Sequence, residues 1–475
     1  MIHILAIFYR HYDEKGNKEE AVAFAYSHSG LAIILTAATT ALGLLSFITA
    51  DLAPVKGFGI FASAGVIFAL IYTMILIPAI ISIVPIKRKQ NENGIRKSLV
   101  IDKLLAALSE FTINHPYLIL SLSALIVVFS VTGIFNIRFG HDIIRWMPED
   151  SVLRKGTEKI DHVLHGTNIL HVVLDFENKD SLYDPAILNK LEKSGKTLEK
   201  LRVGPIFVGK AWSVTSILKE INQALHDGQE QYYTVPQDKN LIAQEFLLFE
   251  NSGSDDLSDF TDKKFQKAHL FLKLPFLDAI YYDNFFNAIK KHFHENYPGV
   301  DATLTGIFKI YIQTFSATLI SMTKSYFFSL VTISCLMLLF LGVRYGFLSL
   351  IPNLFPIVFS LGLMGWLNLS MNFSTMMMAC IALGLVVDDT IHFIHTFKKY
   401  FEINGDAAEA IRMTFQTTGR ALLMTSIVLT FAFLVFMMAT LSNFFDFGLL
   451  TAIAIFMALL SDFFITPSIL ILIKK

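Results

Sequence analysis

The chain has 475 residues, of which 53% are hydrophobic and only 17% are charged, whereas an ordinary globular protein carries about 25% charged residues. It contains 43 Phe and 15 Met, more apolar side chain than one compact core can bury, which excludes a disordered chain, a coiled coil and a disulfide scaffold. Its two cysteines, Cys335 and Cys380, both lie in apolar runs. The net charge of −1 creates no global field that attracts nucleic acid, so no nucleic-acid partner is expected.

Long uncharged stretches predict membrane-spanning helices, since a span needs roughly 20 consecutive apolar residues. A partial span comes first, at residues 1–8, and no basic segment precedes it, which argues against a signal peptide. Eight full spans follow, at residues 29–50, 57–84, 117–137, 325–343, 348–367, 373–397, 421–445 and 447–472. The fifth and sixth come from one charge-free run, which the polar cluster of Asn368, Ser370 and Asn372 divides into a hairpin.

Basic residues in short loops indicate the orientation of such a protein. When the spans alternate, the basic residues at 10–18, 87–97, 344, 398–399 and 474–475 all fall on one side, which we assign as cytoplasmic. The polar block 138–324 then lies on the opposite, periplasmic side. We therefore expect an integral protein of the bacterial inner (plasma) membrane.

Five segments are predicted in chain order. Residues 1–85 hold the end of a first transmembrane repeat, 86–113 a cytoplasmic linker with an amphipathic segment, and 114–137 a transmembrane helix. Residues 138–324 form the polar domain, and 325–475 a second transmembrane repeat of five spans. In the polar domain, strands are predicted at 169–176, 205–208, 268–274 and 302–306, and helices at 184–201, 214–226, 241–249 and 283–296. Two successive strand–helix–strand units indicate small α+β subdomains.

An internal repeat links the two ends of the chain. Ile2 and His3 match Ile391 and His392, and this offset of 389 positions holds without a gap as far as Pro78, which matches Pro467. Further matches include Phe8 with Phe397, Gly16 with Gly405, Glu20 with Glu409, Gly30 with Gly419, Thr36 with Thr425, and Gly59 with Gly448. Chance similarity between apolar helices would not align Gly, Glu and Pro in one register. Parallel repeats of this kind are a recurring plan of transporters.

The two copies differ in what precedes them. Residues 325–390 add further spans before the second copy, whereas nothing precedes the first. A complete first half would need additional helices and an outer domain of its own. We therefore expect this chain to be the C-terminal portion of a longer protein, with a separately encoded N-terminal half as a candidate partner.

The most specific local motif is GLVVDDTIH at residues 384–392. Asp388 lies about 22 Å along its predicted helix from Phe373, at 1.5 Å per residue, which is within the bilayer. A charge at that depth costs at least about 2.5–3.5 kcal/mol, so the acid must face the bundle interior and find partners. His392 follows Asp388 by one helical turn, so Asp388, Asp389 and His392 share nearly one face.

A proton relay is the function that this acid stripe favours, because buried carboxylate and imidazole groups change protonation near neutral pH. The alternative is an acid that a helix–helix hydrogen bond neutralises permanently. Gly384, one turn before the acids, would let a neighbouring helix approach closely. Supporting roles are assigned to Thr390, to Thr425 and to His395, which extends the stripe. Thr425, Ser426 and Thr430 on the following helix could hydrogen-bond the acids, although backbone hydrogen bonding is at least as good an explanation of these hydroxyl residues.

Other polar residues in the spans are weaker candidates for a functional role. Asp462 is the only other acid deep in a span, and its equivalent in the first copy is Thr73, so the repeat does not support a shared role. Arg420 and Asp446 lie near span ends, where interfacial positions are expected. No metal site is predicted, because no third helix offers a ligand cluster.

Several segments resemble one superfamily of membrane transporters. GLVVDDTIHFIHTFKKY is similar to its tenth helix, in which acids carry the coupling proton, and HSGLAIILTAATTALGLLSF with DLAPVKGFGIF is similar to its fifth and sixth. LTGIFKIYIQTF resembles the exit from the second outer domain. On these motifs, which extend over essentially the whole chain, the sequence resembles the resistance–nodulation–division (RND) superfamily, specifically its MMPL-like exporter branch, which is related to sterol-sensing domains.

The resemblance implies a polytopic α-helical membrane bundle with an inserted α+β extracytoplasmic porter-like domain, and about eight full spans plus a partial one at the N-terminus. It implies an exporter of hydrophobic or amphiphilic, lipid-like substrates that is driven by the proton gradient and needs no cofactor. Asp388 and Asp389 would be its proton-relay positions, with His392 as their partner. Membrane lipids and a second copy of the chain are the other partners implied.

Two alternatives stay open. One is a lipid-binding module of the sterol-sensing type without proton coupling, and the other is a translocation helper of the SecDF kind. The large polar block and the acid stripe fit the exporter and the helper better than the lipid module. An enzyme is not expected, because no constellation in the polar domain has the spacing of nucleophile, base and orienting group. Ser213 and His226, for example, are too scattered to support one.

Overall fold

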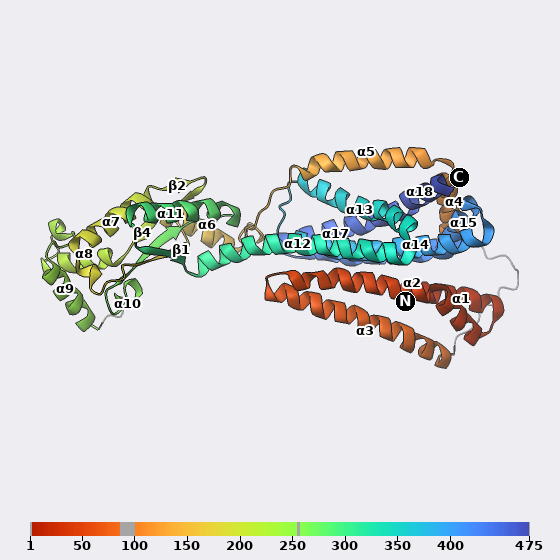
Figure 1. Ribbon diagram of the computed structural model, residues 1–475, viewed down its shortest axis with the longest axis horizontal. Helices are drawn as coiled ribbons and strands as arrows, with labels where there is room; N and C mark the ends of the chain where they lie inside the picture. Colours follow the sequence, from red (N-terminus) through yellow and green to blue (C-terminus); the bar gives the residue numbers. More distant parts are fainter. Residues whose placement is uncertain (1, 86–99, 254–256, 475) are drawn as a thin grey trace. The chain divides into compact units, whose positions relative to one another are not determined.

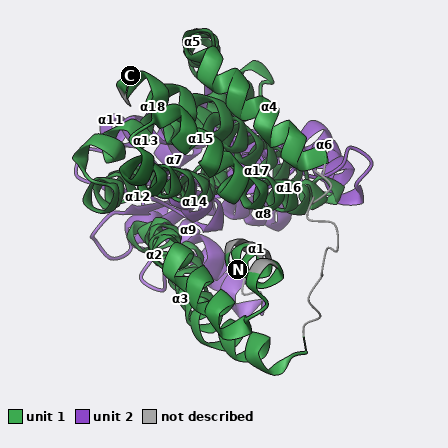
Figure 2. Cartoon of the chain, turned by 90° about the vertical axis from the view of Figure 1, so that its right-hand side faces the viewer, with its two compact units in different colours: residues 1–139, 318–475 green, residues 140–317 purple. Residues whose placement is uncertain are grey.

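The computed structural model describes residues 2–85, 100–253 and 257–474 (Figure 1). The chain divides into two compact units, Met1–Phe139 with Thr318–Lys475 as unit 1 and Gly140–Ala317 as unit 2 (Figure 2). Among the described residues, eight helices are long and apolar enough to cross a membrane. The chain is thus an integral membrane protein, a polytopic helical bundle with one inserted α+β unit, as predicted.

The first repeat segment consists of α1 (Ile2–Lys15), α2 (Lys18–Leu45), a short 3-10 helix (Ser46–Thr49) and α3 (Ala53–Ile83). The helix α2 begins well before the predicted span at 29–50, because the side chain of Asn17 accepts hydrogen bonds from the backbone N–H groups of Glu19 and Glu20. Such a cap satisfies the free donors of the first turn. Of the partial span predicted at 1–8, residue 1 lies outside the described residues, and residues 2–8 belong to α1, which continues to Lys15.

Two helices connect this segment to unit 2. Of the predicted linker 86–113, residues 86–99 lie outside the described residues, and the rest forms most of α4 (Val100–Asn114). The helix α5 (Pro116–Ile134) packs against α13 (Val343–Trp366) through three glycines. A Cβ atom at Gly133 would overlap the carbonyl oxygen of Gly362, and one at Gly365 would overlap that of Gly133. Only residues without side chains allow two helices to cross this closely.

The second transmembrane segment begins with α12 (Ile307–Leu341) and the hairpin of α13 and α14 (Phe373–Asn404). The polar cluster expected to divide this hairpin lies between its helices, and Asn372 forms a capping box with Thr375 at the start of α14. The remaining elements are α15 (Ala407–Thr414), a π-helical turn (Phe415–Gly419), α16 (Arg420–Leu434), a 3-10 helix (Val435–Met438), α17 (Ser442–Leu460), a second π-helical turn (Ser461–Ile465) and α18 (Thr466–Lys474).

Element boundaries fall at matching positions in the two segments in which the sequence predicts a repeat. The pairs are the ends of α1 and α14 at Lys15 and Asn404, the two 3-10 helices, and the starts of α3 and α17 at Ala53 and Ser442. Each pair is separated by the offset of 389 found between His3 and His392. Asn17 and Asp406, which follow the same spacing, both cap the next helix with their side chains.

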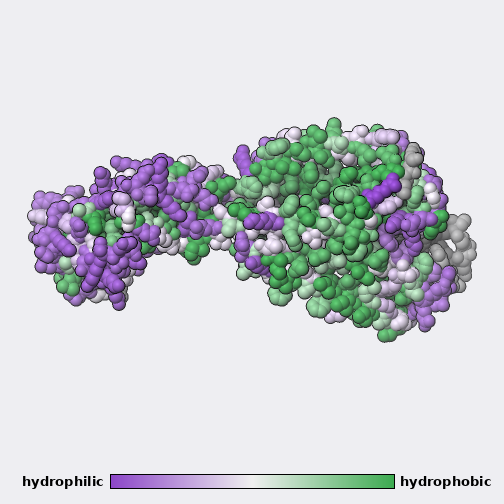
Figure 3. All heavy atoms as spheres, viewed as in Figure 1, coloured by the Kyte–Doolittle hydropathy of each residue, from purple (hydrophilic) through white to green (hydrophobic). Residues whose placement is uncertain are grey.

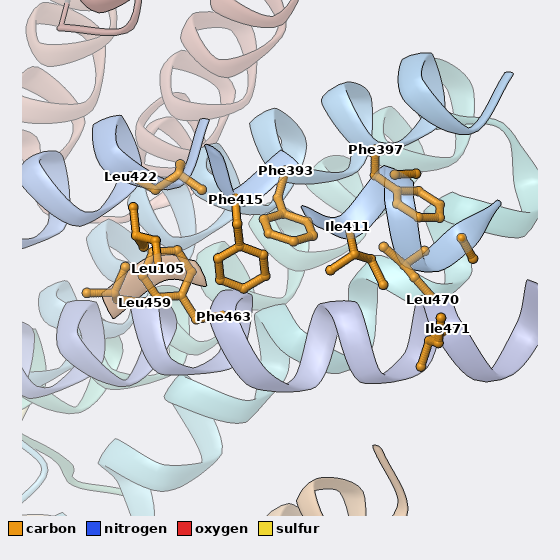
Figure 4. Close-up of a cluster of buried hydrophobic side chains, with 12 residues drawn as sticks. Leu105, Phe393, Phe397, Ile411, Phe415, Leu422, Leu459, Phe463, Leu470 and Ile471 are labelled. Atoms are coloured by element: carbon orange, nitrogen blue, oxygen red, sulfur yellow. The ribbon is translucent and has the colours of Figure 1, made fainter. Parts of the chain in front are cut away.

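The bundle has an apolar surface and an aromatic core. Figure 3 shows hydrophobic residues over most of the visible face of unit 1 and hydrophilic residues over unit 2. On α3, for example, Phe61 is 78% exposed, as suits contact with lipid chains rather than water. Inside, Phe393 of α14, Phe415 and Phe463 of the π-helical turns and Leu105 of α4 belong to one buried cluster (Figure 4), which anchors α4 to the second segment.

In the described residues of unit 2, four strands form an antiparallel sheet in the order β4-β5-β1-β6. Its elements are α6 (Val152–Leu164), β1 (Asn168–Asp175), α7 (Pro185–Glu199), β2 (Arg202–Val203), β3 (Ile206–Phe207), β4 (Lys210–Trp212), α8 (Val214–Leu225), α9 (Lys239–Asn251), α10 (Leu257–Phe260), β5 (Lys267–Leu274), α11 (Tyr282–Asn296) and β6 (Asp301–Thr305). Short 3-10 helices lie at Ser181–Tyr183, Glu230–Tyr232 and Ala279–Tyr281.

This sheet differs from the two small subdomains expected from the strand order. Leu170 of β1 lies opposite Leu272 of β5, and Val172 lies opposite Leu270. All four side chains are buried, so the apolar face of each strand needs the other, and the two predicted units form a single sheet. The strand predicted at 205–208 instead forms a separate hairpin with β2, and β4 takes its place at the sheet edge.

Candidate functional site

Two adjacent carboxyl groups lie midway along α14. The capping box at Asn372 fixes the start of this helix, and Asp388 follows about 22 Å farther along its axis. Asp388 and Asp389 are both half-buried, in contrast to Val386, Val387 and Thr390 around them, which are buried. The acids therefore face an internal space rather than packed side chains.

Asp388 is held by α2 of the first segment. The Oγ1 of Thr40 donates to Oδ1 and Oδ2 of Asp388 at 3.2 and 3.3 Å, and the Oγ1 of Thr39 lies 3.4 Å from Oδ1. Thr40 also lies 3.3 Å from the carbonyl oxygen of Gly384. A Cβ atom at Gly384 would stand 3.7 Å from the Cα of Thr40, so this glycine faces α2, as expected for a close helix contact.

Asp389 is held by a different helix, α16. The Oγ of Ser426 donates a 2.6 Å hydrogen bond to Oδ2 of Asp389. Its neighbour Thr425 donates to the backbone carbonyl groups of Ala421 and Leu422, at 3.0 and 2.9 Å. Among the described residues, neither acid forms an ion pair with a lysine or arginine. A negative charge on this pair is therefore met by hydroxyl donors and not by a lysine or arginine of the described residues.

The acids open into a cavity of about 180 Å³ between four helices. Its walls come from α2, α14, α16 and α17 and consist of Ile33, Thr36, Leu385, Val386, Asp388, Asp389, His392, Thr425, Leu429, Ile455 and Ala458. A space of this size with several polar groups can hold a few water molecules. Water, two carboxyl groups and one imidazole within a single cavity are the components that proton transfer requires.

The structure brings together four of the seven residues selected from the sequence. Asp388, Asp389, His392 and Thr425 line the cavity, and His392 is only 6% exposed. Gly384 packs against α2, and His395 is half-buried outside the cavity lining. Thr390 points elsewhere, where its Oγ1 contacts Oδ1 of Asn353 at 2.7 Å and Oδ1 of Asp462 at 2.6 Å.

Sequence reasoning missed the α2 partners of Asp388. The hydroxyl residues Thr36, Thr39 and Thr40 recur at helical spacing within TAATTA, which was a usable signal for a polar face directed into the bundle. Asn353 was also missed. It lies beside Pro352 in α13, and nothing in its local sequence distinguishes it from an ordinary amide in a span.

The model of the MMPL family matches residues 5–98 and 283–474 of this chain. A curated relative, a membrane protein of Methanocaldococcus jannaschii, is 19% identical over 394 residues, which are 79% of this chain and 96% of the relative.

Similar folds occur among solved membrane proteins. The hedgehog release protein Disp from the water bear Hypsibius dujardini matches with a TM-score of 0.64 at 13% identity, over 100% of this chain and 62% of Disp. SecDF from Thermus thermophilus, a translocon-associated membrane protein, matches with a TM-score of 0.53 at 13% identity, over 100% of this chain and 53% of SecDF. The chain thus spans between half and two thirds of the length of these solved structures.

Proposed function

Because this chain belongs to the MMPL family, we propose that it exports hydrophobic or amphiphilic, lipid-like molecules and that the proton gradient drives this export. The carboxyl groups of Asp388 and Asp389 take up and release the coupling protons, and His392 exchanges protons with them through water in the cavity. The observation that carries this proposal is the small polar cavity that encloses these three side chains in the middle of the membrane bundle.

The position of the acids between the two repeat segments suggests how protonation is coupled to movement. Thr36 of α2 and Thr425 of α16 are equivalent in the repeat, and both line the cavity. Asp388 is hydrogen-bonded from α2 and Asp389 from α16. Neutralising Asp388 weakens its contact with the first segment, whereas neutralising Asp389 weakens a contact within the second segment. Protonation of Asp388 therefore shifts one segment relative to the other, the rocking motion that repeat-built transporters use.

The proposed orientation places the lysine-rich ends of the helices in the cytoplasm. Lys15 ends α1, Lys18 begins α2, and the Nζ of Lys399 in α14 lies 2.8 Å from Nδ1 of His28 in α2. A cytoplasmic position of these cations follows the distribution of basic residues in membrane proteins. Unit 2, whose surface is hydrophilic (Figure 3), then lies on the periplasmic side of the bacterial inner membrane, where a substrate would leave.

The test uses the full chain in proteoliposomes that carry a fluorescent phospholipid analogue and an imposed pH gradient. Export should stop in Asp388→Asn and in Asp389→Asn, because an amide keeps the shape of the carboxyl group but cannot carry the proton. Asp446→Asn is the matched control, since Asp446 lies near the start of α17 and outside the cavity lining, and it should export normally. Unchanged gradient-driven export in the double variant would refute the proposal.

The same preparation separates this proposal from the two alternatives. A lipid-binding module of the sterol-sensing type would bind the analogue equally well with and without both carboxyl groups and would move none of it. A translocation helper would leave the analogue in place and instead make protein translocation depend on the acids. The SecDF likeness concerns the fold alone at 13% identity, so the measured cargo decides between them.

A further inference from the structure

A third intramembrane carboxyl group lies outside the cavity in a separate polar cluster. Asp462 is 1% exposed and sits in the π-helical turn between α17 and α18, an element found often at functional sites. Its Oδ1 accepts hydrogen bonds from the Oγ1 of Thr390 at 2.6 Å and from that of Thr466 at 3.2 Å. Its Oδ2 contacts no polar partner among the described residues.

The hydrogen bonds of Thr390 determine whether Asp462 carries a proton. The hydroxyl of Thr390 has one proton, yet it contacts two acceptor oxygens, Oδ1 of Asp462 at 2.6 Å and Oδ1 of Asn353 at 2.7 Å. Asn353 is 3% exposed, and its Nδ2 has no partner among the described residues. With the amide placed this way, Asp462 must be protonated and donate to Thr390, which donates to Asn353. If the Asn353 amide flips, its Nδ2 donates to the Thr390 hydroxyl, and that hydroxyl donates its proton to an ionised Asp462.

Asp462, Thr390 and Asn353 can therefore be linked by two hydrogen-bond arrangements, which differ by one proton on Asp462. A buried carboxylate with one unpaired oxygen is unfavourable, whereas the neutral acid is not. The contacts of 2.6 and 2.7 Å are direct hydrogen bonds, so these three oxygens do not surround a metal cation. A proton is the ligand that this geometry fits.

We propose that Asp462 is a second proton-binding site, which exchanges its proton with Asp389 while Thr390 and Asn353 stabilise both of its states. In the transfer, the O–H bond of Asp462 breaks, an O–H bond forms on the Asp389 carboxylate, and the amide of Asn353 turns to donate towards Thr390. Asp389 directly precedes Thr390 on α14, so the Asp389 side chain and the Thr390 hydroxyl that contacts Asp462 lie on neighbouring faces of that helix. The inference rests on the proposed function for its role in export but not for the titration itself.

Among the charged groups on the helices around Asp462, Asp389 is the one available to exchange a proton with it. On α14, Asp388 is bound by α2 and His392 faces the cavity. The helix α5 carries no charge, Arg344 of α13 donates to the carbonyl oxygen of Ile473, and Glu110 of α4 pairs with Arg412. Asp102 and Lys103 belong to the first turn of α4, and Asp446 precedes Asp462 by about 24 Å along α17.

Infrared difference spectroscopy on the full chain in nanodiscs tests this inference without requiring transport. A carbonyl band of a buried, protonated carboxyl group should appear and titrate in the wild type and in the Asp388→Asn, Asp389→Asn double variant. It should vanish when Asp462→Asn is added to that double variant. Thr390→Val keeps the carboxyl group but removes its hydrogen-bond partner, so the band should persist at a shifted frequency.

Two results would overturn the inference. One is a band that survives when Asp462→Asn is added to the double variant, and the other is a band whose frequency Thr390→Val leaves unchanged. The second result decides the question even if Asp462→Asn fails to fold. Replacing potassium by sodium should leave the titration unchanged, and a sodium-dependent loss of the band would identify a metal-cation site instead. These spectra report the protonation of Asp462 and not transport, so they can be interpreted even if the chain exports no lipid analogue.

Discussion

Asp388 and Asp389 are consecutive residues, yet their carboxyl groups are held by helices from opposite ends of the chain. Asp388 accepts its hydrogen bonds from Thr40 of α2, and Asp389 accepts its hydrogen bond from Ser426 of α16. Because consecutive side chains on a helix point about 100° apart, one acidic dipeptide can contact two neighbouring helices at once. A single proton on either residue therefore weakens one specific helix contact.

Removing the hydroxyl of Ser426 should impair export without unfolding the bundle. A hydrogen bond to a charged group contributes about 1.5–3 kcal/mol, so Ser426→Ala should slow gradient-driven export roughly tenfold or more, since 1.36 kcal/mol is a factor of ten. Ser334→Ala is the control, because the hydroxyl of Ser334 bonds only within its own helix, to the carbonyl oxygen of Leu330. Equal export rates in both variants would contradict a role for the Ser426 contact.

Equivalent glycines of the two repeat segments should respond alike to substitution. A Cβ atom at Gly59 would stand 2.8 Å from the carbonyl oxygen of Leu44, and one at Gly448 would stand 2.7 Å from that of Phe433. Both contacts are closer than real Cβ atoms tolerate, so each Gly→Ala change should cost about 1–3 kcal/mol of stability. Thermal unfolding in detergent measures this cost.

The control for this pair is Gly65→Ala in α3, where a Cβ atom would meet nothing within 4 Å. This variant should match or slightly exceed the wild type in stability, because alanine favours a helix over glycine. A large loss at only one of Gly59 and Gly448 would argue against equivalent packing in the two segments.

The fold was predictable where a single physical property decides it. A charge-free run of about 20 residues can satisfy its backbone in lipid only as a helix, and this alone located the eight spans. An acid inside such a run is conspicuous for the same reason, which singled out Asp388 and Asp389.

The partners of the acids depend on helix rotation and packing, which a single sequence does not encode locally. Thr39 and Thr40 have the same sequence appearance as threonines that bond to their own helix, as Thr451 does. Asp462 gained no support from the repeat because its equivalent is Thr73, yet it lies at the centre of a buried hydrogen-bond cluster. Likewise, β4 is too short for strand periodicity to be visible, and its place depends on β5.

Acidification should weaken the sheet of unit 2 at a pair of histidines. Nδ1 of His269 donates to the carbonyl oxygen of Asp259 at 2.6 Å, so its Nε2 accepts a 2.9 Å hydrogen bond from Nδ1 of His171. Burial lowers the pKa of both imidazoles, and the neighbouring His269 lowers the pKa of His171 further. The folded pKa values lie below the unfolded value of about 6.5. The stabilisation is therefore complete above pH 6.5 and is lost as the pH falls from there through the folded pKa values.

Hydrogen exchange of the β1 and β5 amides at pH 7.5 and pH 5 measures this effect in the full chain. The wild type should lose protection at pH 5, whereas His171→Phe, which cannot be protonated, should lose less. His294→Phe, an imidazole in the last turn of α11, is the control and should follow the wild type. Equal losses in the wild type and His171→Phe would show that the pair does not titrate in this range.

Glu245 should destabilise unit 2 as the pH rises. Its side chain is 1% exposed, neither carboxyl oxygen has a hydrogen-bond partner among the described residues, and burial raises its pKa from 4.5 to about 7, against a smaller opposing effect of His226. Because the folded pKa exceeds the unfolded value, the folded state binds the proton more tightly, so stability falls as the pH rises from about 4.5 through 7. The cost at pH 8 is about 3 kcal/mol.

Glu245→Gln should therefore increase hydrogen-exchange protection of α9 at pH 8 and change it little at pH 4.5. The exposed Glu250 on the same helix provides the control, and a Glu250→Gln variant that reproduced the gain would assign it to overall charge rather than to the buried carboxyl group.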